Sequence, residues 1–479
     1  MTAHNFFKDY AADGVFDEVF SRKSDAKIKS SLIDRLKKFK LKTLERRKLA
    51  AERELYNLGI TFTVYSDAGA IDRILPFDVL PRPIAASDWR TLERGCKQRV
   101  TALNAFLGDI YGAQKILKDG VVPRELVLGN KNYSEAMANL KVKNNAYAVV
   151  SGVDVIRDTN GDFLVLEDNC RCPSGVSYVI ENRHLMMRAF PDLMAGIKLR
   201  AVSDYGTKLR EKLSEAAPGA ITQPEAVLLT PGVFNSAYFE HVFLAREMGV
   251  PLVEGRDLFV EDDKVFMRTV SGKQRVHVIY RRIDDDFLDP EVFRADSALG
   301  VPGLMRALVR GNVALANAIG AGIADDKALY AYTPEIIKYY LDEDPILSIV
   351  QTYAGRNPEE LSYILENLEY LVLKPVGGSG GYGIVVGPKA TKRELSEARS
   401  ALKRNPKNFV AQPMVNLSAS PTLTEDGVEP RHVDLRPFVL AGKDTWVLPG
   451  GLTRVALRKG SIVVNSSQGG GSKDTWVYA

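Results

Sequence analysis

One stretch of the sequence combines a lysine with a glycine-rich loop between two apolar runs. It reads LVLKPVGGSGGYGIVVGP over residues 371–388, and the lysine is Lys374. The flanking apolar residues predict two strands joined by the loop. Glycines let backbone N–H groups approach phosphate oxygens where a Cβ would stand in the way, and a lysine supplies charge that a polyphosphate needs. We therefore predict a nucleoside triphosphate site at Lys374 and the loop residues Gly378, Ser379, Gly380, Gly381, Tyr382 and Gly383.

Three other phosphate-binding loops fit this stretch less well. The dinucleotide-binding pattern G-x-G-x-x-G requires a helix after the loop, whereas a strand-like run follows Gly383. A P-loop ends in G-K-[ST], but Ile384 follows the last glycine here. Protein kinases place their lysine after the loop, and no H-R-D or D-F-G occurs downstream. The alternative without chemistry is a surface hairpin.

A second stretch, residues 146–169, predicts a hairpin that carries acidic side chains. Its sequence is AYAVVSGVDVIRDTNGDFLVLEDN, and Asn160-Gly161 is a strong hairpin signal. A two-residue type I′ turn there places Asp154 directly opposite Glu167, with Asn169 on the same face. The other face, toward the core, then carries Val153, Val155, Leu164 and Leu166.

Two carboxylates at directly opposite positions repel each other unless a cation lies between them. Mg²⁺ binds oxygen ligands and bridges the phosphates of a nucleotide, so it would resolve this repulsion. The sequence thus favours a magnesium site at Asp154 and Glu167. An exposed hairpin, whose like charges are relieved by a lysine or by water, is the alternative.

These motifs together resemble those of the ATP-grasp superfamily. The hairpin residues Asp154, Glu167 and Asn169, followed by Pro173-Ser-Gly175, resemble its metal-binding hairpin, and Lys374 precedes a glycine flap. In most of the superfamily the hairpin follows the flap, whereas here it precedes the flap by about two hundred residues. This order resembles the circularly permuted ATP-grasp family (type 2), which includes glutathionylspermidine synthetase-like proteins, over most of the chain.

The resemblance implies a role for each motif. Many relatives have an arginine two residues before the first metal-binding Asp, and this chain has Gly152. The cation for the transferring phosphoryl group must then come from a later strand, at Arg436 or Arg454. The implied set is Asp154, Glu167 and Asn169 for Mg²⁺, Lys327 and Lys374 for the ATP phosphates, Gln412 in the strand that reads adenine, and Arg436 and Arg454 as catalytic residues.

The implied fold is α+β, a circularly permuted ATP-grasp fold in four parts. The N-terminal part is mainly helical, with a basic amphipathic helix at residues 22–48, a proline-containing loop at residues 77–83 and another helix near residues 88–117. Alternating strands and helices suggest a Rossmann-like preATP-grasp unit later in the chain. The predicted boundaries are 1–145 (helical region), 146–222 (metal hairpin and helices), 223–320 (Rossmann-like unit) and 321–479 (nucleotide-binding subdomain and the remaining strands).

Residues after two predicted strands of the 223–320 unit are candidates for substrate binding. Asn235 and Ser236 stand where a loop enters a helix, and the N–H groups of a helix start favour a carboxylate. Arg281 and Arg282, followed by three aspartates, could grip a zwitterionic substrate. For His241 a packing role is favoured.

Composition excludes several classes of protein. The 479 residues are enough for two or three domains, and the net charge of +4 gives no case for nucleic acid. Three cysteines, Cys96, Cys170 and Cys172, make neither a disulfide framework nor a zinc site. We find no apolar run of 18 residues and no signal-peptide pattern, so we expect a cytoplasmic protein without a membrane partner.

The sequence therefore predicts an ATP-dependent and Mg²⁺-dependent ligase. Such an enzyme phosphorylates a small-molecule or peptide carboxylate, and an amine then attacks the acyl phosphate to give an amide and ADP. A phosphotransferase that uses the same site with a hydroxyl or another stable acceptor is one alternative. A nucleotide-binding regulator without turnover is another.

Overall fold

The computed structural model describes residues 7–8, 10–12, 14–21, 26–66, 69–377, 383–461, 464–465 and 469–479, with the backbone alone at residues 26–30, 62–66 and 69–73. Within these ranges no helix is both long and apolar enough to cross a membrane.

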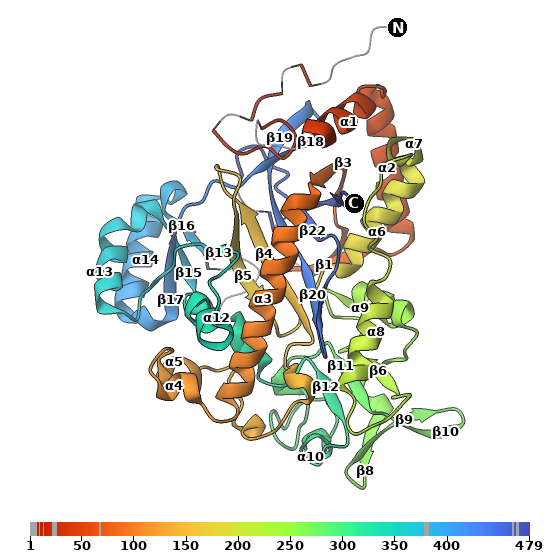
Figure 1. Ribbon diagram of the computed structural model, residues 1–479, viewed down its shortest axis with the longest axis vertical. Helices are drawn as coiled ribbons and strands as arrows, with labels where there is room; N and C mark the ends of the chain where they lie inside the picture. Colours follow the sequence, from red (N-terminus) through yellow and green to blue (C-terminus); the bar gives the residue numbers. More distant parts are fainter. Residues whose placement is uncertain are drawn as a thin grey trace.

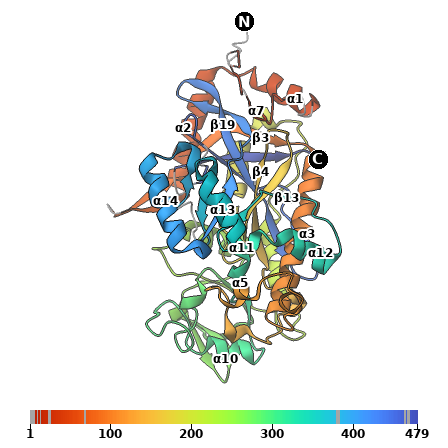
Figure 2. The same ribbon diagram turned by 90° about the vertical axis from the view of Figure 1, so that its left-hand side faces the viewer.

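A ten-stranded sheet forms the centre of the molecule, and it is built from both ends of the chain. Its main path is β13-β5-β4-β19-β22-β23-β3, with β18, β20 and β21 attached at β19 and β4. Figures 1 and 2 show β4, from the first third of the chain, beside the C-terminal strand β19. The strands are β3 (Phe77–Ile84), β4 (Val150–Arg157), β5 (Phe163–Asn169), β13 (Ser348–Ile349), β18 (Ala419–Thr424), β19 (Gly427–Arg436), β20 (Phe438–Ala441), β21 (Thr445–Val447), β22 (Leu452–Val455) and β23 (Gly471–Val477).

The N-terminal region is not a separate helical unit, because β3 pairs in parallel with β23 in the central sheet. The predicted loop at residues 77–83 is therefore wrong. Pro81 and Pro83 are tolerated since β3 lies at the edge of the sheet, where a missing N–H costs no ladder bond. The basic helix is also broken, near Lys40. The region's other elements are α1 (Ala26–Leu36), α2 (Leu41–Asn57), β1 (Thr61–Ser66), β2 (Gly69–Ile74), α3 (Ala86–Ile110), α4 (Lys115–Lys118) and α5 (Arg124–Leu128).

Four parallel strands form a second sheet in the segment where the sequence predicts a Rossmann-like unit. The strand order is β12-β11-β6-β7. A three-stranded antiparallel sheet, β8 to β10, projects beside it at the lower right of Figure 1. The elements are β6 (Ala226–Leu229), β7 (Leu252–Val253), β8 (Leu258–Glu261), β9 (Lys264–Thr269), β10 (Gly272–Arg275), β11 (Val278–Arg281), β12 (Ala314–Ala316), α8 (Tyr205–Ala216), α9 (Tyr238–Met248) and α10 (Leu304–Val309).

A four-stranded antiparallel sheet, β14-β17-β15-β16, carries the glycine-rich stretch. The strands β15 and β16 pair antiparallel on either side of the loop, as the sequence predicts. Two helices, α13 and α14, cover this sheet and face the viewer in Figure 2. The elements are β14 (Tyr353–Ala354), β15 (Leu371–Pro375), β16 (Val385–Val386), β17 (Phe409–Pro413), α13 (Pro358–Asn367) and α14 (Lys392–Arg404).

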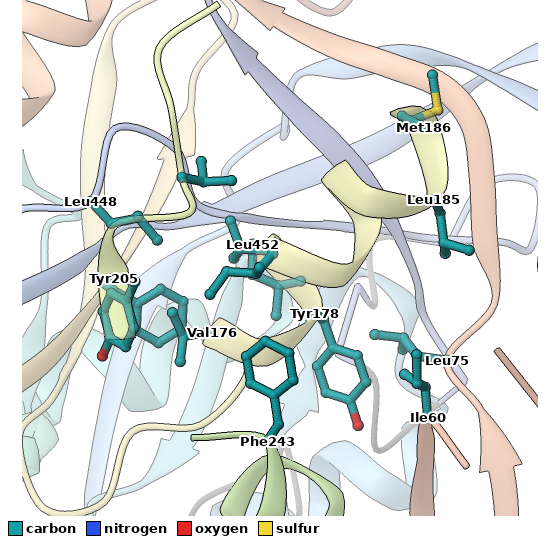
Figure 3. Close-up of a cluster of buried hydrophobic side chains, with 14 of the residues drawn as sticks. Ile60, Leu75, Val176, Tyr178, Leu185, Met186, Tyr205, Phe243, Leu448 and Leu452 are labelled. Atoms are coloured by element: carbon teal, nitrogen blue, oxygen red, sulfur yellow. The ribbon is translucent and has the colours of Figure 1, made fainter. Parts of the chain in front are cut away.

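The helix α6 connects the central sheet to the parallel sheet. Figure 3 shows Tyr178 of α6 between Phe243 of α9 and Leu75. These side chains belong to one large apolar core. Burial of aromatic side chains of this size fixes the relative position of the two units. The remaining helices are α6 (Val176–Ala189), α7 (Pro191–Met194), α11 (Lys327–Tyr330) and α12 (Thr333–Leu341), and the short 3₁₀ turn η5 (Ala321–Asp325) precedes α11.

Candidate active site

A cleft of about 660 Å³ lies where the central sheet, the four-stranded sheet with β15, and the helices α6 and α9 meet. Segments that are far apart in the chain contribute side chains to it. The sequence-predicted residues that line it are Asp154, Glu167, Asn169, Ser236, Lys327, Lys374, Arg436 and Arg454.

The hairpin β4–β5 has the predicted pairing at the cleft but a different turn. Asp154 lies directly opposite Glu167. The turn holds three residues between Asp158 and Asp162, not two, and Gly161 takes φ +87° in it. A β-bulge next to Asp154 offsets this shift of one position.

The bulge also changes which side chains face the core. Val165, rather than the predicted Leu166, pairs with Val155 and joins Val153 in one apolar cluster. Leu164 and Leu166 pack against a different cluster, and Leu166 reaches the cleft. The predicted core face is therefore right for β4 and wrong for β5.

Asp154 is buried and bonded to two arginines. Both of its carboxylate oxygens accept bonds from Arg436, and Oδ2 also accepts one from Nη2 of Arg454 at 2.6 Å. Burial alone would raise the pKa of Asp154, but the charges of Arg436 and Arg454 outweigh it and hold the pKa below its usual range. The carboxylate thus stays ionised and fixes the two guanidinium groups.

Arg436 fills the space beside Gly152. A Cβ at position 152 would lie 3.1 Å from Cδ of Arg436 and 3.4 Å from its Cγ. Arg436 also donates to the carbonyl oxygen of Ser174 at 3.1 Å. The Arg436 side chain therefore lies against position 152, where the ATP-grasp resemblance implies an arginine.

Glu167 and Asn169 have the chemistry of magnesium ligands. The nearest cations to the Glu167 carboxylate are Lys327 at 3.8 Å and Arg436 at 4.0 Å, so its oxygens remain available. Burial and the charge of Asp154 raise the pKa of Glu167. The buried Nδ2 of Asn169 has no hydrogen-bond partner, which is unusual for a buried amide.

Asp154 fits the metal site less well than these two residues, because its oxygens already bind guanidinium groups. Across the described ranges, no group of three His, Cys, Asp or Glu side chains is arranged to hold a metal. A set made of Glu167 and the Asn169 amide oxygen is consistent with that observation.

Two lysines reach the cleft from different elements. Lys327 is the first residue of α11, whose start is capped by the Asp326 side chain. Lys374 is the residue before the last one of β15 and donates to Oε1 of Gln412 at 2.6 Å, and Gln412 in turn donates to Thr352. Burial lowers the pKa of Lys374 to about 8; the Lys327 charge also lowers it, whereas Glu167 opposes the shift.

The remaining predicted nucleotide residues are Gln412 and the residues of the glycine-rich loop. Gln412 is buried behind Lys374 and orients its ammonium. Gly383 has φ +73° beside Pro375. The loop residues Gly378, Ser379, Gly380, Gly381 and Tyr382 lie outside the described ranges.

The substrate candidates separate into one that faces the cleft and several that do not. Ser236 lines it, whereas the Asn235 side chain accepts a bond from the backbone N–H of Ala237. His241 is buried and bonded to Thr230, in line with a packing role.

Arg281 and Arg282 are both buried inside the protein. Arg281 donates to three backbone carbonyl groups, and Arg282 donates to the carbonyl of Pro173 and pairs with Glu240 at 3.1 Å. Neither residue lines the cleft, and both are buried in its wall.

Several cleft residues have no distinctive sequence signal. Glu240 accepts bonds from the backbone N–H groups of Gly175 and Ser177 and thereby fixes the start of α6. Asp325 lines the cleft too, and burial raises its pKa to about 7. Lys131 comes from the N-terminal region, for which the sequence predicts no chemistry.

Comparisons with known proteins found a matching family and a similar fold. Residues 81–456 match the family described as circularly permuted ATP-grasp type 2. A glutathione synthetase like-effector from Globodera pallida has a similar fold, with a TM-score of 0.59 at 11% identity over 92% of this chain and 98% of that one.

Relatives in several bacteria match nearly the whole chain. An uncharacterized protein of Synechocystis sp. is 50% identical over 98% of both chains, and one of Mycobacterium tuberculosis is 53% identical over 91% of this chain and 79% of its own. A Frankia alni protein named "Putative glutamate--cysteine ligase 2-3" is 44% identical over 91% of this chain, which spans 50% of that protein. The match over residues 81–456 shows that this chain belongs to the circularly permuted ATP-grasp type 2 family.

Proposed function

We propose that the protein is an ATP-dependent carboxylate–amine ligase that works through an acyl phosphate. A substrate carboxylate oxygen attacks the γ-phosphorus of ATP, the bond to the β,γ-bridging oxygen breaks, and ADP leaves. An amine then attacks the acyl carbon and loses a proton, the C–O bond to the phosphate breaks, and an amide and inorganic phosphate result. The observation that carries this proposal is the convergence of Asp154, Glu167, Lys327, Lys374 and Arg436 in one cleft.

Two lysines are placed to hold the triphosphate. Positioning and charge neutralisation account for most of the catalysis of phosphoryl transfer. We assign Lys327 and Lys374 to the phosphate oxygens, because both line the cleft and the charge of Glu167 acts on both. In this assignment Gln412 holds the Lys374 ammonium in place, and β17 offers its backbone to the adenine.

Arg436 is the residue that we assign to the transferring phosphoryl group. Its guanidinium is held by Asp154 and by the carbonyl of Ser174, so little reorganisation is needed when charge develops on the phosphoryl oxygens. Arg454 lies behind it, bonded to Asp154 and to Asp434. We assign Arg454 a positioning role, through Asp154.

Glu167 and Asn169 are the side chains that we propose as ligands of Mg²⁺. Asp154 joins them only if Arg436 releases one of its bonds to the carboxylate. When bound, Mg²⁺ neutralises charge on the β- and γ-phosphate oxygens.

The acceptor end of the cleft is the part lined by Ser174, Tyr178, Ser236 and Glu240. We place the substrate carboxylate there, near Ser236 at the start of α9. The name of the Frankia alni relative supports a ligase, but this chain spans 50% of that protein, so the name does not decide the substrate. We therefore propose a small-molecule or peptide carboxylate and an amine.

Hydroxylamine trapping tests this proposal directly. The protein is incubated with ATP, Mg²⁺, hydroxylamine and a pool of metabolite carboxylates, and hydroxamate and ADP are measured. We expect both products, and neither from a Lys374→Met control. A stable phosphorylated product in place of hydroxamate would indicate a phosphotransferase, and nucleotide binding without ADP would indicate a regulator.

A further inference from the structure

The loop after α5, residues 129–133, is docked on the segment that carries Lys327. Nδ2 of Asn130 donates to Oδ2 of Asp326 at 2.6 Å, and Nδ2 of Asn132 donates to the carbonyl oxygen of Gly322 at 3.1 Å. The Tyr133 ring stacks on that of Tyr111, with centroids 5.0 Å apart. The loop is thus held at three of its five residues.

Lys131 stands between the two asparagines and points into the cleft. It lines the cleft together with Gly377, which follows β15 by two residues. The Nζ atom of Lys131 lies 3.2 Å from the place that a Cβ at Gly377 would take, and its Cε lies 3.3 Å away. The ammonium group therefore touches the base of the glycine-rich stretch.

The Lys131 ammonium has no paired carboxylate among the described residues, although Glu167 and Asp326 also line the cleft. Lys131, Lys327 and Lys374 line the same cleft, and like charges in one cleft repel each other. Arg171, another cation of the cleft, pairs with Asp284 at 3.5 Å. A docked loop thus holds an uncompensated positive charge beside two lysines assigned to phosphates.

We propose that Lys131 is a third phosphate-binding lysine of the nucleotide site, supplied by the N-terminal region and directed at the terminal phosphates of ATP. This inference rests on the proposed function. It assigns the loop at residues 129–133 a role that neither the glycine-rich stretch nor the metal hairpin provides. An anionic acceptor substrate is the competing ligand for the same ammonium, and the test separates the two.

Calorimetry with three nucleotides tests this assignment. Affinities for AMP, ADP and a non-hydrolysable ATP analogue are measured with Mg²⁺ for wild type, Lys131→Ala, Asn132→Ala and Lys141→Ala. Lys141 is an exposed lysine of the same region and lies outside the lining of this cleft, so it is the matched control. Thermal unfolding of each variant shows whether the fold is retained.

We expect Lys131→Ala to lower the affinity for the ATP analogue roughly tenfold, which is the usual loss for one charge-assisted contact. The affinity for AMP should not change. Asn132→Ala should give a smaller loss of the same kind, because it loosens the loop and keeps the charge. Equal affinities in wild type and Lys131→Ala, or a raised KM for the acceptor alone, would overturn the assignment. Absence of nucleotide binding by the wild type would contradict the proposed function as well.

Discussion

Arg436 is the residue that we propose as the substitute for the arginine absent at position 152. Position 152 is a glycine, and the Arg436 side chain lies against it. The local sequence around Gly152 gives no sign of this, because Arg436 lies 284 positions further along the chain. Only the pairing of β4 with β19 and β20 brings the two positions together.

This arrangement predicts the outcome of moving the arginine. Arg436→Ala should lower kcat by about 10²–10³, the usual cost of one preorganised charge-stabilising donor. Gly152→Arg alone should also have a low kcat, because the new side chain collides with Arg436. The double variant Gly152→Arg/Arg436→Ala should recover part of kcat, and steady-state ADP release measures all three. A double variant no better than Arg436→Ala would contradict the spatial equivalence.

Lys374 should make nucleotide binding depend on pH. Burial lowers its pKa to about 8, so the free protein loses this ammonium as pH rises through that value. Phosphates favour the protonated form, hence ATP affinity should be highest below pH 8 and fall above it, with proton uptake on binding. Calorimetry from pH 6.5 to 9.5 measures this. Lys374→Met should bind weakly at every pH, and the same fall in that variant would assign the titration to another group.

At the residue scale, the sequence was informative where chemistry and local pattern coincide. Lys374 precedes a glycine loop, and Glu167 faces Asp154 across a hairpin, so both could be predicted to reach the site. Arg281 and Arg282 could not be placed, because a charged pair after a strand gives no indication of burial. Lys131 has no local signal at all.

At the scale of elements, the hairpin β4–β5 has the predicted pairing of Asp154 with Glu167 but differs from the prediction in its turn and in a bulge. The turn is one residue longer than predicted, and the bulge beside Asp154 cancels the difference. Asn160-Gly161 signals a hairpin but does not fix its length, since three-residue loops with glycine in the left-handed region are also common. The bulge has no sequence signature here.

Gly161 should be sensitive to a single methyl group. Its φ is +87°, and a Cβ would lie 2.7 Å from Cε2 of Phe16. Gly161→Ala should therefore destabilise the protein by about 1–3 kcal/mol, through backbone strain and through displacement of Phe16. Gly120→Ala is the matched control, because Gly120 has φ +73° and open space around it. Urea unfolding measures both, and equal losses would exclude the Phe16 contact.

The edge strand β3 shows why a proline pattern misled. Two prolines within seven residues indicate a loop, yet all eight residues of β3 are buried. An edge strand accepts proline on its unpaired side, and its position at the edge depends on β23, more than 380 residues away. Local sequence patterns do not predict long-range strand pairing of this kind.

At the scale of the whole molecule, the buried Glu18 links three strands of the central sheet. Its carboxylate accepts bonds from Arg82 of β3 at 2.6 Å and from Arg157 of β4 at 3.1 Å, and Ser418, next to β18, donates at 3.0 Å. Burial would raise the pKa of Glu18, but Arg82 and Arg157 outweigh it and lower the pKa. The N-terminal segment is thereby attached to the sheet.

Glu18 should therefore contribute stability that depends on pH. Glu18→Gln leaves the buried Arg82 without its counterion and Arg157 with Asp88 alone, so we expect a loss of about 3–5 kcal/mol at pH 7. A lowered folded pKa means that this contribution is complete above the unfolded pKa, near 4.3, and is lost as pH falls through the folded value. The difference in the free energy of unfolding between variant and wild type, measured with urea, should thus become smaller below pH 4.

Glu125→Gln provides the control for this measurement. Glu125 also pairs with an arginine, Arg356 at 3.0 Å, but its side chain is 69% exposed. Exposed ion pairs contribute about 0–1 kcal/mol, so stability should hardly change. If Glu18→Gln lowered the free energy of unfolding by the same amount down to pH 3, side-chain packing and not charge would be responsible.

The permuted order of the chain also separates the synthesis of the two halves of the central sheet in time. Asp154 is synthesised 282 residues before Arg436. At roughly 5–20 residues per second on the ribosome, that interval is about 15–55 s. Throughout it, the nascent hairpin carries carboxylates whose guanidinium partners do not yet exist, and β4 lacks its neighbour β19. The cleft can therefore assemble only late in translation, when the strand that bears Arg436 has left the exit tunnel.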